Sequence, residues 1–376
     1  MLTKTWARTW LAVIALTCAV AGCARPGPSV LIPVQTVAPG AKLVTVYVAT
    51  TRQRERDSAI VYTTDRAPKL GYAEFTIAIP PHHKPGEIEW PATTPNPETD
   101  FVTVQQRILS SAEFERKVSA RAPGGGRKAG VFIHGYNVSF QESVFRLAQM
   151  ASDADIDGIP ILFAWPAGET LVGYVGDKEA ATYSRDALVQ LLTVLRRDRK
   201  PGDVTLLGHS MGAWLTVEAL RQLRMTGRSA TLAGLNVILA APDIDLDVFS
   251  AQMRVIGPLT PPMTVLVSPD DKALAFAGSV AGDRKRLGAL DMDSPGVKEA
   301  ARAAGIRIVD ISNMKSPDPL DHDGYVTYAT LYSRLGGMER RRAGGDFGQT
   351  GAFVVTSFGT AIASPFTLFG SVLAGQ

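Results

Sequence analysis

Apolar residues in this chain form short continuous runs, and these alternate with longer segments in which apolar residues recur at helical spacing. Continuous runs rich in Val, Ile and Leu are typical of strands buried on both faces of a parallel sheet. These runs cover residues 131–134, 161–165, 204–208, 237–241, 264–268 and 306–311. The segments with helical spacing are residues 140–151, 180–197 and 213–225. The alternation predicts an α/β fold, either doubly wound or a barrel.

Two further strands are predicted ahead of this alternation, over residues 43–49 and 72–79, where β-branched residues alternate with others. Residues 80–97 contain six prolines, which predicts an extended loop. We find no repeat with a period of about 20 to 50 residues, and this disfavours a barrel. The expected architecture is therefore a mostly parallel, doubly wound sheet of eight strands with helices on both faces.

The N-terminus has the composition of an export signal. Lys4 and Arg8 precede an apolar stretch over residues 11–20, which is too short to cross a bilayer as a permanent helix. Cys23 follows a Val-Ala-Gly sequence, and this resembles the lipobox of bacterial lipoproteins, in which the cysteine becomes the lipidated N-terminus. An ordinary secretory signal cut near Ala21 is the alternative.

The chain contains two cysteines, Cys18 and Cys23, and Cys18 lies within the segment that would be removed. We expect the mature protein in the bacterial cell envelope, anchored through lipidated Cys23 and facing the periplasm. The expected organisation is a signal peptide at 1–22, a Pro-rich tether at 23–41, one α/β domain at 42–336 and an extension at 337–376. The extension is rich in Gly, Ala and Phe, and its residues 349–376 carry no charge.

The charge pattern argues against one class of partner. The chain has 39 basic and 36 acidic residues, a formal net charge of +3. It has no run of about five or six like charges, which a nucleic-acid-binding tail would contain. We therefore expect no nucleic-acid partner.

Residues 208–212 read Gly-His-Ser-Met-Gly and fit the pattern G-x-S-x-G between a predicted strand and a predicted helix. A strand that turns sharply into a helix holds its nucleophile in a strained backbone, so the flanking positions need glycines. The start of the helix also points unpaired backbone N–H groups at the site, where negative charge develops. The pattern predicts Ser210 as the nucleophile of a serine hydrolase.

A serine hydroxyl needs a base, and in enzymes with this turn the chain order is nucleophile, acid, histidine. The chain has five histidines, at His82, His83, His134, His209 and His322. Since only His322 follows Ser210, it is the predicted general base.

Three aspartates are candidates for the acid that orients His322. Asp270 and Asp271 follow one predicted strand, and Asp243 follows the strand before it. Asp271 is preferred because, in enzymes with this turn at the nucleophile, the acid usually lies three residues after the small residue that ends the strand, here Ser268. Asp270 and Asp243 remain alternatives.

The oxyanion of an acyl-transfer intermediate needs two backbone donors. In enzymes with this turn, one follows the nucleophile and the other lies in the loop after the third strand of the core. The N–H groups of Met211 and Tyr136 are the predicted pair.

His134 is interpreted as a structural residue, hydrogen-bonded within its loop. His82 and His83 lack the ligand spacing of a metal site, so no metal or other cofactor is expected.

These stretches resemble a bacterial α/β-hydrolase family of unknown function that is grouped with esterases and lipases. The resemblance runs from about Leu43 to Gly336 and rests on residues 131–137, 163–166, Tyr174, Asp177, 208–212, 241–243 and 271–274. It implies the α/β-hydrolase fold but little about the substrate. Only about twenty residues separate Asp243 from Thr264, where cap insertions usually occur, so no large cap is expected.

The resulting hypothesis is a serine hydrolase that cleaves carboxylic esters, as small molecules or lipids, through an acyl-enzyme. An amidase, thioesterase or lipase with the same triad is the enzymatic alternative. The alternative without enzymatic activity is a scaffold protein of the cell envelope that has a hydrolase fold. Without a cap, Tyr136, Trp165, Trp214 and the Pro-rich loop would border the pocket. For Trp214, packing of its helix is the favoured alternative role.

Overall fold

In the computed structural model, the described residues are 25–55, 61–92, 94–120, 128–154, 158–170, 173–330 and the strand at 354–355. The predicted signal peptide, Cys23 and all of the predicted extension except this strand lie outside the described residues. Among the described residues, no helix is both long enough and apolar enough to cross a membrane.

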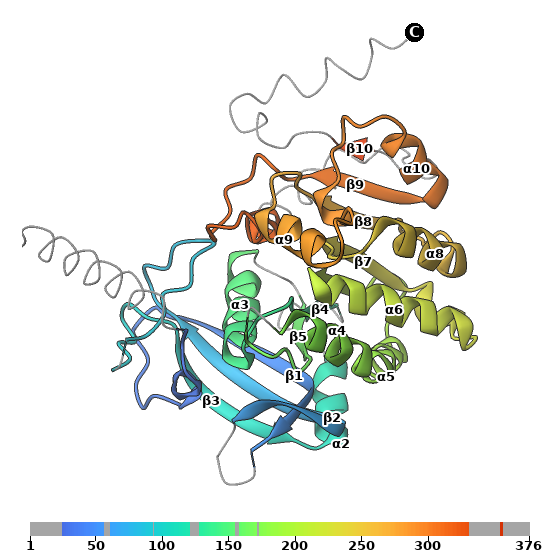
Figure 1. The fold of residues 1–376 in the computed structure, drawn as a ribbon. Helices are drawn as coiled ribbons and strands as arrows, with labels where there is room; N and C mark the ends of the chain where they lie inside the picture. The colour runs from blue at the N-terminus through green and yellow to red at the C-terminus, as the bar shows by residue number, and fades with distance from the viewer. Residues whose placement is uncertain are drawn as a thin grey trace, which may run out of the picture.

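The described strands form one ten-stranded sheet in the order β10-β9-β8-β7-β6-β4-β5-β1-β2-β3 (Figure 1). The neighbours are parallel except for β1 with β2 and β2 with β3, which are antiparallel at one end of the sheet. The strands are β1 (Lys42–Arg54), β2 (Tyr62–Ile79), β3 (Val102–Leu109), β4 (Ala129–Ile133), β5 (Ile159–Ala164), β6 (Val204–His209), β7 (Leu235–Ala240), β8 (Met263–Val267), β9 (Ile306–Asp310) and β10 (Val354–Val355). The sheet is therefore mostly parallel, as predicted.

All eight predicted strands are present, and the sheet has two more than predicted, β3 and β10. β3 reads Val-Thr-Val-Gln-Gln-Arg-Ile-Leu, and its polar centre breaks the continuous apolar run that predicts the other strands. Such a composition suits its position, because β3 lies at the edge of the sheet and pairs only with β2 among the described strands.

The connecting helices match the predicted alternation. They are α2 (Ser111–Ser119), α3 (Phe140–Asp153), α4 (Tyr174–Tyr183), α5 (Arg185–Arg196), α6 (Met211–Met225), α7 (Ser229–Leu232), α8 (Leu246–Ile256), α9 (Lys272–Val280) and α10 (Val297–Ala304), with 3₁₀ turns η1 (Pro28–Leu31) and η2 (Leu287–Ala289). The predicted helix at 180–197 is two helices, α4 and α5, because the chain turns at Ser184. The Ser184 hydroxyl donates to the Ala180 carbonyl and lies 2.8 Å from the Thr51 hydroxyl.

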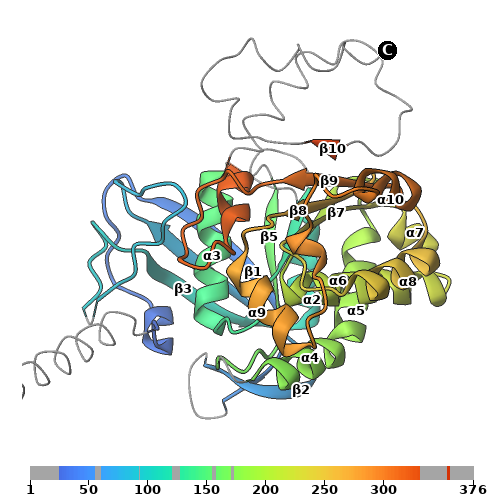
Figure 2. The ribbon, with the colours of Figure 1, turned by 45° about the horizontal axis from the view of Figure 1, so that its top comes forward.

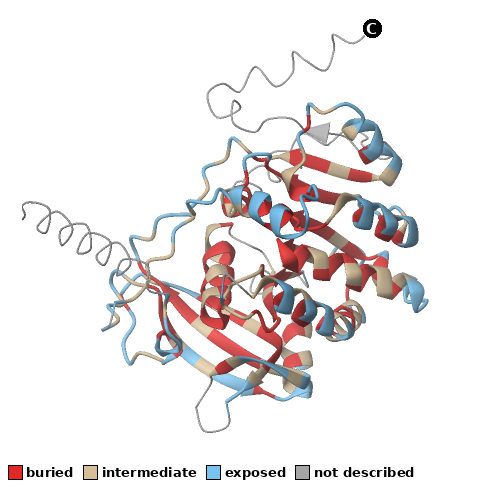
Figure 3. Cartoon of the chain, in the orientation of Figure 1, coloured by how far each residue is buried: buried red, intermediate tan, exposed pale blue. Residues whose placement is uncertain are grey.

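Two hydrophobic cores cover the two faces of the sheet. Figure 3 shows that most of the strand residues between the helices are buried. Val131 and Ile133 of β4 face one core, with α2, α5, α6 and α8, whereas Phe132 between them faces the other. The second core contains α3 and the helical residues 324–330, which lie close together in Figure 2. Apolar residues on both faces explain the continuous runs in the sequence.

Side-chain caps determine where several helices begin. Ser110 with Glu113 and Ser139 with Glu142 form capping boxes at α2 and α3. Asp271 caps α9, accepting a hydrogen bond from the Leu274 N–H at 2.9 Å. The cap at α9 holds Asp271 at the carboxyl end of β8, the edge of the sheet where sites of α/β proteins form.

Candidate active site

Ser210 lies between β6 and α6, in the strained turn that the sequence predicts. Its backbone has φ 54° and ψ −120°, a positive φ that a residue with a side chain rarely adopts. A Cβ on Gly208 would lie 2.9 Å from the Ala213 Cα, and one on Gly212 would overlap the carbonyl oxygens of Ile133 and His134. Both glycines are therefore required by the close approach of neighbouring backbone.

Gly135 brings the loop after β4 against Ser210. A Cβ on Gly135 would lie 3.0 Å from the Ser210 Cβ and 2.9 Å from the His209 Nδ1. Tyr136, the next residue, is the predicted oxyanion donor of this loop. Met211, the other predicted donor, is the first residue of α6, and the first N–H groups of a helix have no acceptor within it.

His322 and Asp271 are joined by a hydrogen bond. The His322 Nδ1 donates to the Asp271 Oδ2 at 2.6 Å, and the Asp271 side chain is 1% exposed. Since Nδ1 carries the proton in this bond, neutral His322 keeps Nε2 as an acceptor. The His322 ring centroid lies 4.5 Å from that of His209, the residue before Ser210. The three predicted triad residues thus lie at one edge of the sheet.

The two alternative aspartates occupy different environments. Asp270 is exposed. Asp243 is buried, accepts a hydrogen bond from the Tyr174 hydroxyl at 2.7 Å and lies 3.2 Å from the Arg286 Nε. The structure therefore pairs Asp271 with His322 and Asp243 with other partners.

The neighbouring residues His322 and His209 have pKa values that are shifted in opposite directions. Burial lowers the pKa of His322, but the hydrogen bond and negative charge of Asp271, with the charges of Asp323 and Asp318, outweigh it. The pKa of His322 therefore lies above the ordinary 6.5. Burial and the charge of His322 hold the pKa of His209 well below its ordinary value. His322 is thus the member of the pair that can take up a proton near neutral pH.

His134 and Trp165 support the loop after β4. The His134 Nδ1 donates to the Gly135 carbonyl at 2.9 Å, and the Trp165 Nε1 donates to the His134 carbonyl at 2.8 Å. Burial and the nearby Arg52 lower the pKa of His134 to about 3. His134 has the loop bond that was expected. Trp165 was expected to border the pocket, but it is completely buried in the first core, and its indole stacks on His134.

A cavity of about 230 Å³ adjoins Ser210 through Gly135 and His209, which are part of its wall. Trp90 of the Pro-rich loop also lines it, as expected of that loop. Its polar lining was not predicted and includes the charged side chains of Arg25, Glu142, Arg146 and Asp323. The sequence contains no local signal for these residues, because they come from segments far apart along the chain.

Trp214 and His83 each contact charged side chains. Trp214 packs against the first core, with the Lys178 ammonium 4.2 Å from its ring centroid. His83 lies in the Pro-rich loop and bridges Glu89 and Asp153, with both contacts at 2.8 Å. Within the described part of the chain, no three His, Cys, Asp or Glu side chains form a group that could hold a metal ion.

The comparison with family models agrees with this geometry. Residues 110–340 match the model of the family described as "Alpha/beta hydrolase of unknown function (DUF900)". The chain belongs to this family. The match includes Ser210, Asp271 and His322, and it begins after β1, β2 and β3.

No curated protein matches the sequence. Among solved structures, similarity is found to an esterase of Pyrobaculum calidifontis, with 12% identity over 73% of this chain and 80% of that chain, and a TM-score of 0.31. A structure from work on two esterases of Rhizomucor miehei shares 10% identity over 85% of this chain and 75% of that chain, with a TM-score of 0.27. A lipase-esterase related protein of Clostridium acetobutylicum shares 11% identity over 57% of this chain and 93% of that chain, with a TM-score of 0.23. The fold assignment rests on the family match and the sheet order.

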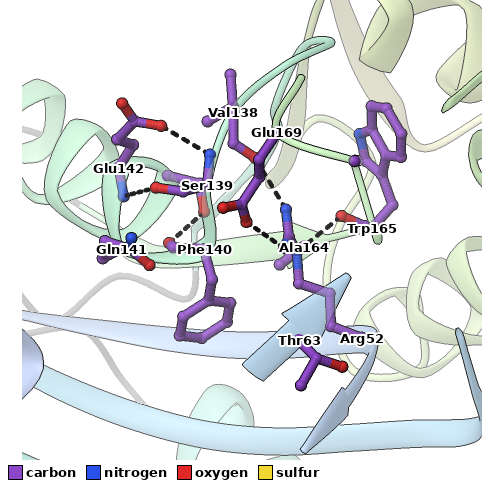
Figure 4. A network of polar contacts seen from close by, with 12 residues as sticks. Arg52, Thr63, Val138, Ser139, Phe140, Gln141, Glu142, Ala164, Trp165 and Glu169 are labelled. Atoms are coloured by element: carbon purple, nitrogen blue, oxygen red, sulfur yellow. Dashed lines mark hydrogen bonds and ion pairs between the residues drawn. The ribbon is translucent and has the colours of Figure 1, made fainter. Parts of the chain in front are cut away.

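Arg52 of β1 connects the two loops beside the site (Figure 4). Its side chain is fully buried and donates to the Val138 carbonyl at 2.8 Å, the Trp165 carbonyl at 3.1 Å and the Glu169 carboxylate at 2.8 Å. One guanidinium thus ties the loop after β4 to the loop after β5. Arg52 lies outside the residues that match the family, and nothing in the sequence predicted its role.

Replacing Arg52 with lysine is expected to lower kcat about tenfold or more with little change in KM, because one ammonium cannot reach three acceptors in a fork. The loop that carries Tyr136 would lose its tie and its fixed distance from Ser210. The measurement is kcat and KM for a chromogenic ester, together with Tm for each variant.

Arg54→Lys, on the same strand but exposed, is the matched control and should behave like the wild type. A lower Tm with unchanged kcat for Arg52→Lys would show that Arg52 contributes only to stability.

Proposed function

We propose that this protein is a serine hydrolase that cleaves carboxylic esters through an acyl-enzyme on Ser210, anchored in the cell envelope, on its periplasmic side, through lipidated Cys23. In this proposal His322 is the base and then the acid, Asp271 orients it, and the N–H groups of Tyr136 and Met211 bind the oxyanion. The hydrogen bond between His322 and Asp271, next to the strained turn at Ser210, carries the proposal.

In the first step, the Ser210 Oγ attacks the ester carbonyl and its proton passes to the His322 Nε2. Asp271 keeps Nδ1 protonated and stabilises the imidazolium that forms. The developing oxyanion receives the two backbone N–H bonds, each worth on the order of 10²- to 10³-fold in rate. His322 then protonates the leaving alcohol, and water repeats the sequence on the acyl-enzyme.

The test is reaction of the purified mature protein with a fluorophosphonate probe and with p-nitrophenyl esters. We expect the probe to attach to the peptide that contains Ser210, as read by mass spectrometry. We also expect a burst of p-nitrophenol equal to the enzyme concentration where deacylation is slow. A panel of matched esters, amides and thioesters separates the ester from the other leaving groups.

The negative results are equally specific. A fluorophosphonate that does not label Ser210 would favour the non-catalytic scaffold. Labelling with turnover of amides or thioesters alone would retain the triad and overturn the ester assignment.

A further inference from the structure

The segment that follows Cys23 packs on the domain. Val30 and Leu31 in η1 are buried in the second core. The Val34 N–H donates to the Thr103 carbonyl at 2.8 Å, and the Thr103 hydroxyl donates to the Val30 carbonyl at 2.9 Å. The sequence predicts a tether over 23–41, and its described part lies against the second core and the edge strand β3.

The start of this segment is bound beside the candidate active site. The Arg25 guanidinium donates to the Asn137 carbonyl and to the Glu169 carbonyl, the latter at 3.1 Å. Its Nε also lies 3.6 Å from the Glu142 carboxylate. Asn137 immediately follows Tyr136, the proposed oxyanion donor. Arg25 therefore contacts the same two loops that Arg52 connects, the loop after β4 and the loop after β5.

A second bond holds the segment in place. The Gln141 amide, in the first turn of α3, donates to the Pro26 carbonyl at 2.7 Å. Arg25 is also part of the wall of the cavity, together with Gly135 and with His209, the residue before Ser210. Arg25, the first described residue of the chain, thus forms part of the rim of this cavity.

The distance from this rim to Cys23 is short. Cys23 precedes Arg25 by two residues, and two extended residues span at most about 7 Å. An acylated Cys23 has its chains in the bilayer and its backbone at the surface. An anchor so close to a docked segment leaves the domain little freedom to turn away from the membrane.

The cavity also restricts what can enter it. Its volume is about 230 Å³. Arg25, Glu142, Arg146 and Asp323 give it a polar wall. It suits the ester and head-group region of an amphiphile, whose apolar chains remain in the bilayer.

From these contacts we infer that the N-terminal segment holds the cavity beside Ser210 at the membrane surface, and that the substrate is an ester-bearing amphiphile resident in that membrane. This inference rests on the proposed ester hydrolysis and on acylation of Cys23. It adds the place and the chemical class of the substrate.

The experiment changes only the length of chain between anchor and domain. A flexible Gly/Ser insertion of about sixteen residues between Ala24 and Arg25 extends the root-mean-square reach by roughly 22 Å. The same insertion after Gly40, an exposed turn residue at φ 81°, is the matched control because the contacts of Arg25 and Leu31 precede it. Each lipidated chain is reconstituted in phosphatidylethanolamine–phosphatidylglycerol vesicles.

Two ester substrates distinguish a change in the position of the domain at the membrane from a change in its catalytic rate. Umbelliferyl palmitate resides in the vesicles, and umbelliferyl acetate is dissolved in the buffer. The insertion before Arg25 is expected to lower turnover of the palmitate on the order of tenfold, as the effective concentration at the surface falls. Turnover of the acetate should stay unchanged, and the insertion after Gly40 should leave both rates unchanged. Equal turnover of the palmitate by all three chains would overturn the inference.

The position of the cavity at the membrane surface can also be measured without enzymatic activity. Brominated lipids quench tryptophan at short range, and Trp90 lines the cavity. We expect quenching in the wild-type chain that is lost in Trp90→Phe and in the insertion before Arg25. Absence of quenching, or recovery of the wild-type chain without lipid on Cys23, would overturn the membrane placement. Quenching without turnover of either ester would instead overturn the proposed hydrolysis.

Discussion

Replacing Ser210 with alanine is expected to lower kcat for p-nitrophenyl esters by about 10⁴-fold or more, because a chain without the hydroxyl cannot form the acyl-enzyme. Alanine has the same backbone requirements as serine at φ 54°, so the strain in the turn is unchanged and Tm should stay close to that of the wild type. The measurements are burst kinetics, fluorophosphonate labelling and thermal unfolding.

Ser279→Ala provides the control, since Ser279 is exposed at the end of α9 and its hydroxyl donates only to a local carbonyl, that of Phe276. Its activity should match that of the wild type. Undiminished ester hydrolysis by Ser210→Ala would place the nucleophile elsewhere and remove the basis of the proposed function.

Replacing Asp271 with asparagine is expected to lower kcat/KM by about 10²- to 10⁴-fold. The amide keeps the volume of the side chain and an oxygen for the Leu274 N–H, so α9 retains its cap. It removes the charge that stabilises the imidazolium. Far-ultraviolet circular dichroism should therefore be unchanged while the rate falls.

The pH dependence of kcat/KM follows from the hydrogen bond between Asp271 and His322. His322 accepts a proton only when neutral, so activity is lost as pH falls through its pKa, which lies above 6.5 in the wild type. The charge of Asp271 is among the causes that raise this pKa. The acid limb of kcat/KM should therefore move to lower pH in Asp271→Asn, and a pH profile of both proteins measures it.

The alternative aspartates supply the matched controls. Asp270→Asn changes an exposed neighbour and should leave both the rate and the pH profile intact. Asp243→Asn weakens the buried pair with Arg286 and should lower Tm without moving the acid limb. A shifted acid limb in either of these variants, with none in Asp271→Asn, would reassign the acid.

The sequence alone predicted eight of the ten described strands and the chain order of the proposed catalytic residues. Continuous apolar runs predicted the parallel strands because such strands are buried on both faces, and the turn at Ser210 could be recognised because its steric demands fall on immediate neighbours. The proposed base also came from chain order, since His322 is the only histidine after Ser210. β3 was missed because the polar residues of an edge strand break the apolar pattern.

Tertiary structure decided what adjacency in the chain could not. The position of Ser268 favours Asp271 over its neighbour Asp270 but leaves both open, whereas the cap of α9 and the hydrogen bond to His322 pair Asp271 with the histidine. Arg52 reaches Val138 and Glu169 across 86 and 117 residues, and Arg25 reaches Asn137 across 112. Such contacts depend on which strands lie side by side, here β1 beside β5. Short-range sterics shape the turn at Ser210, whereas the order of the sheet determines which distant side chains surround it.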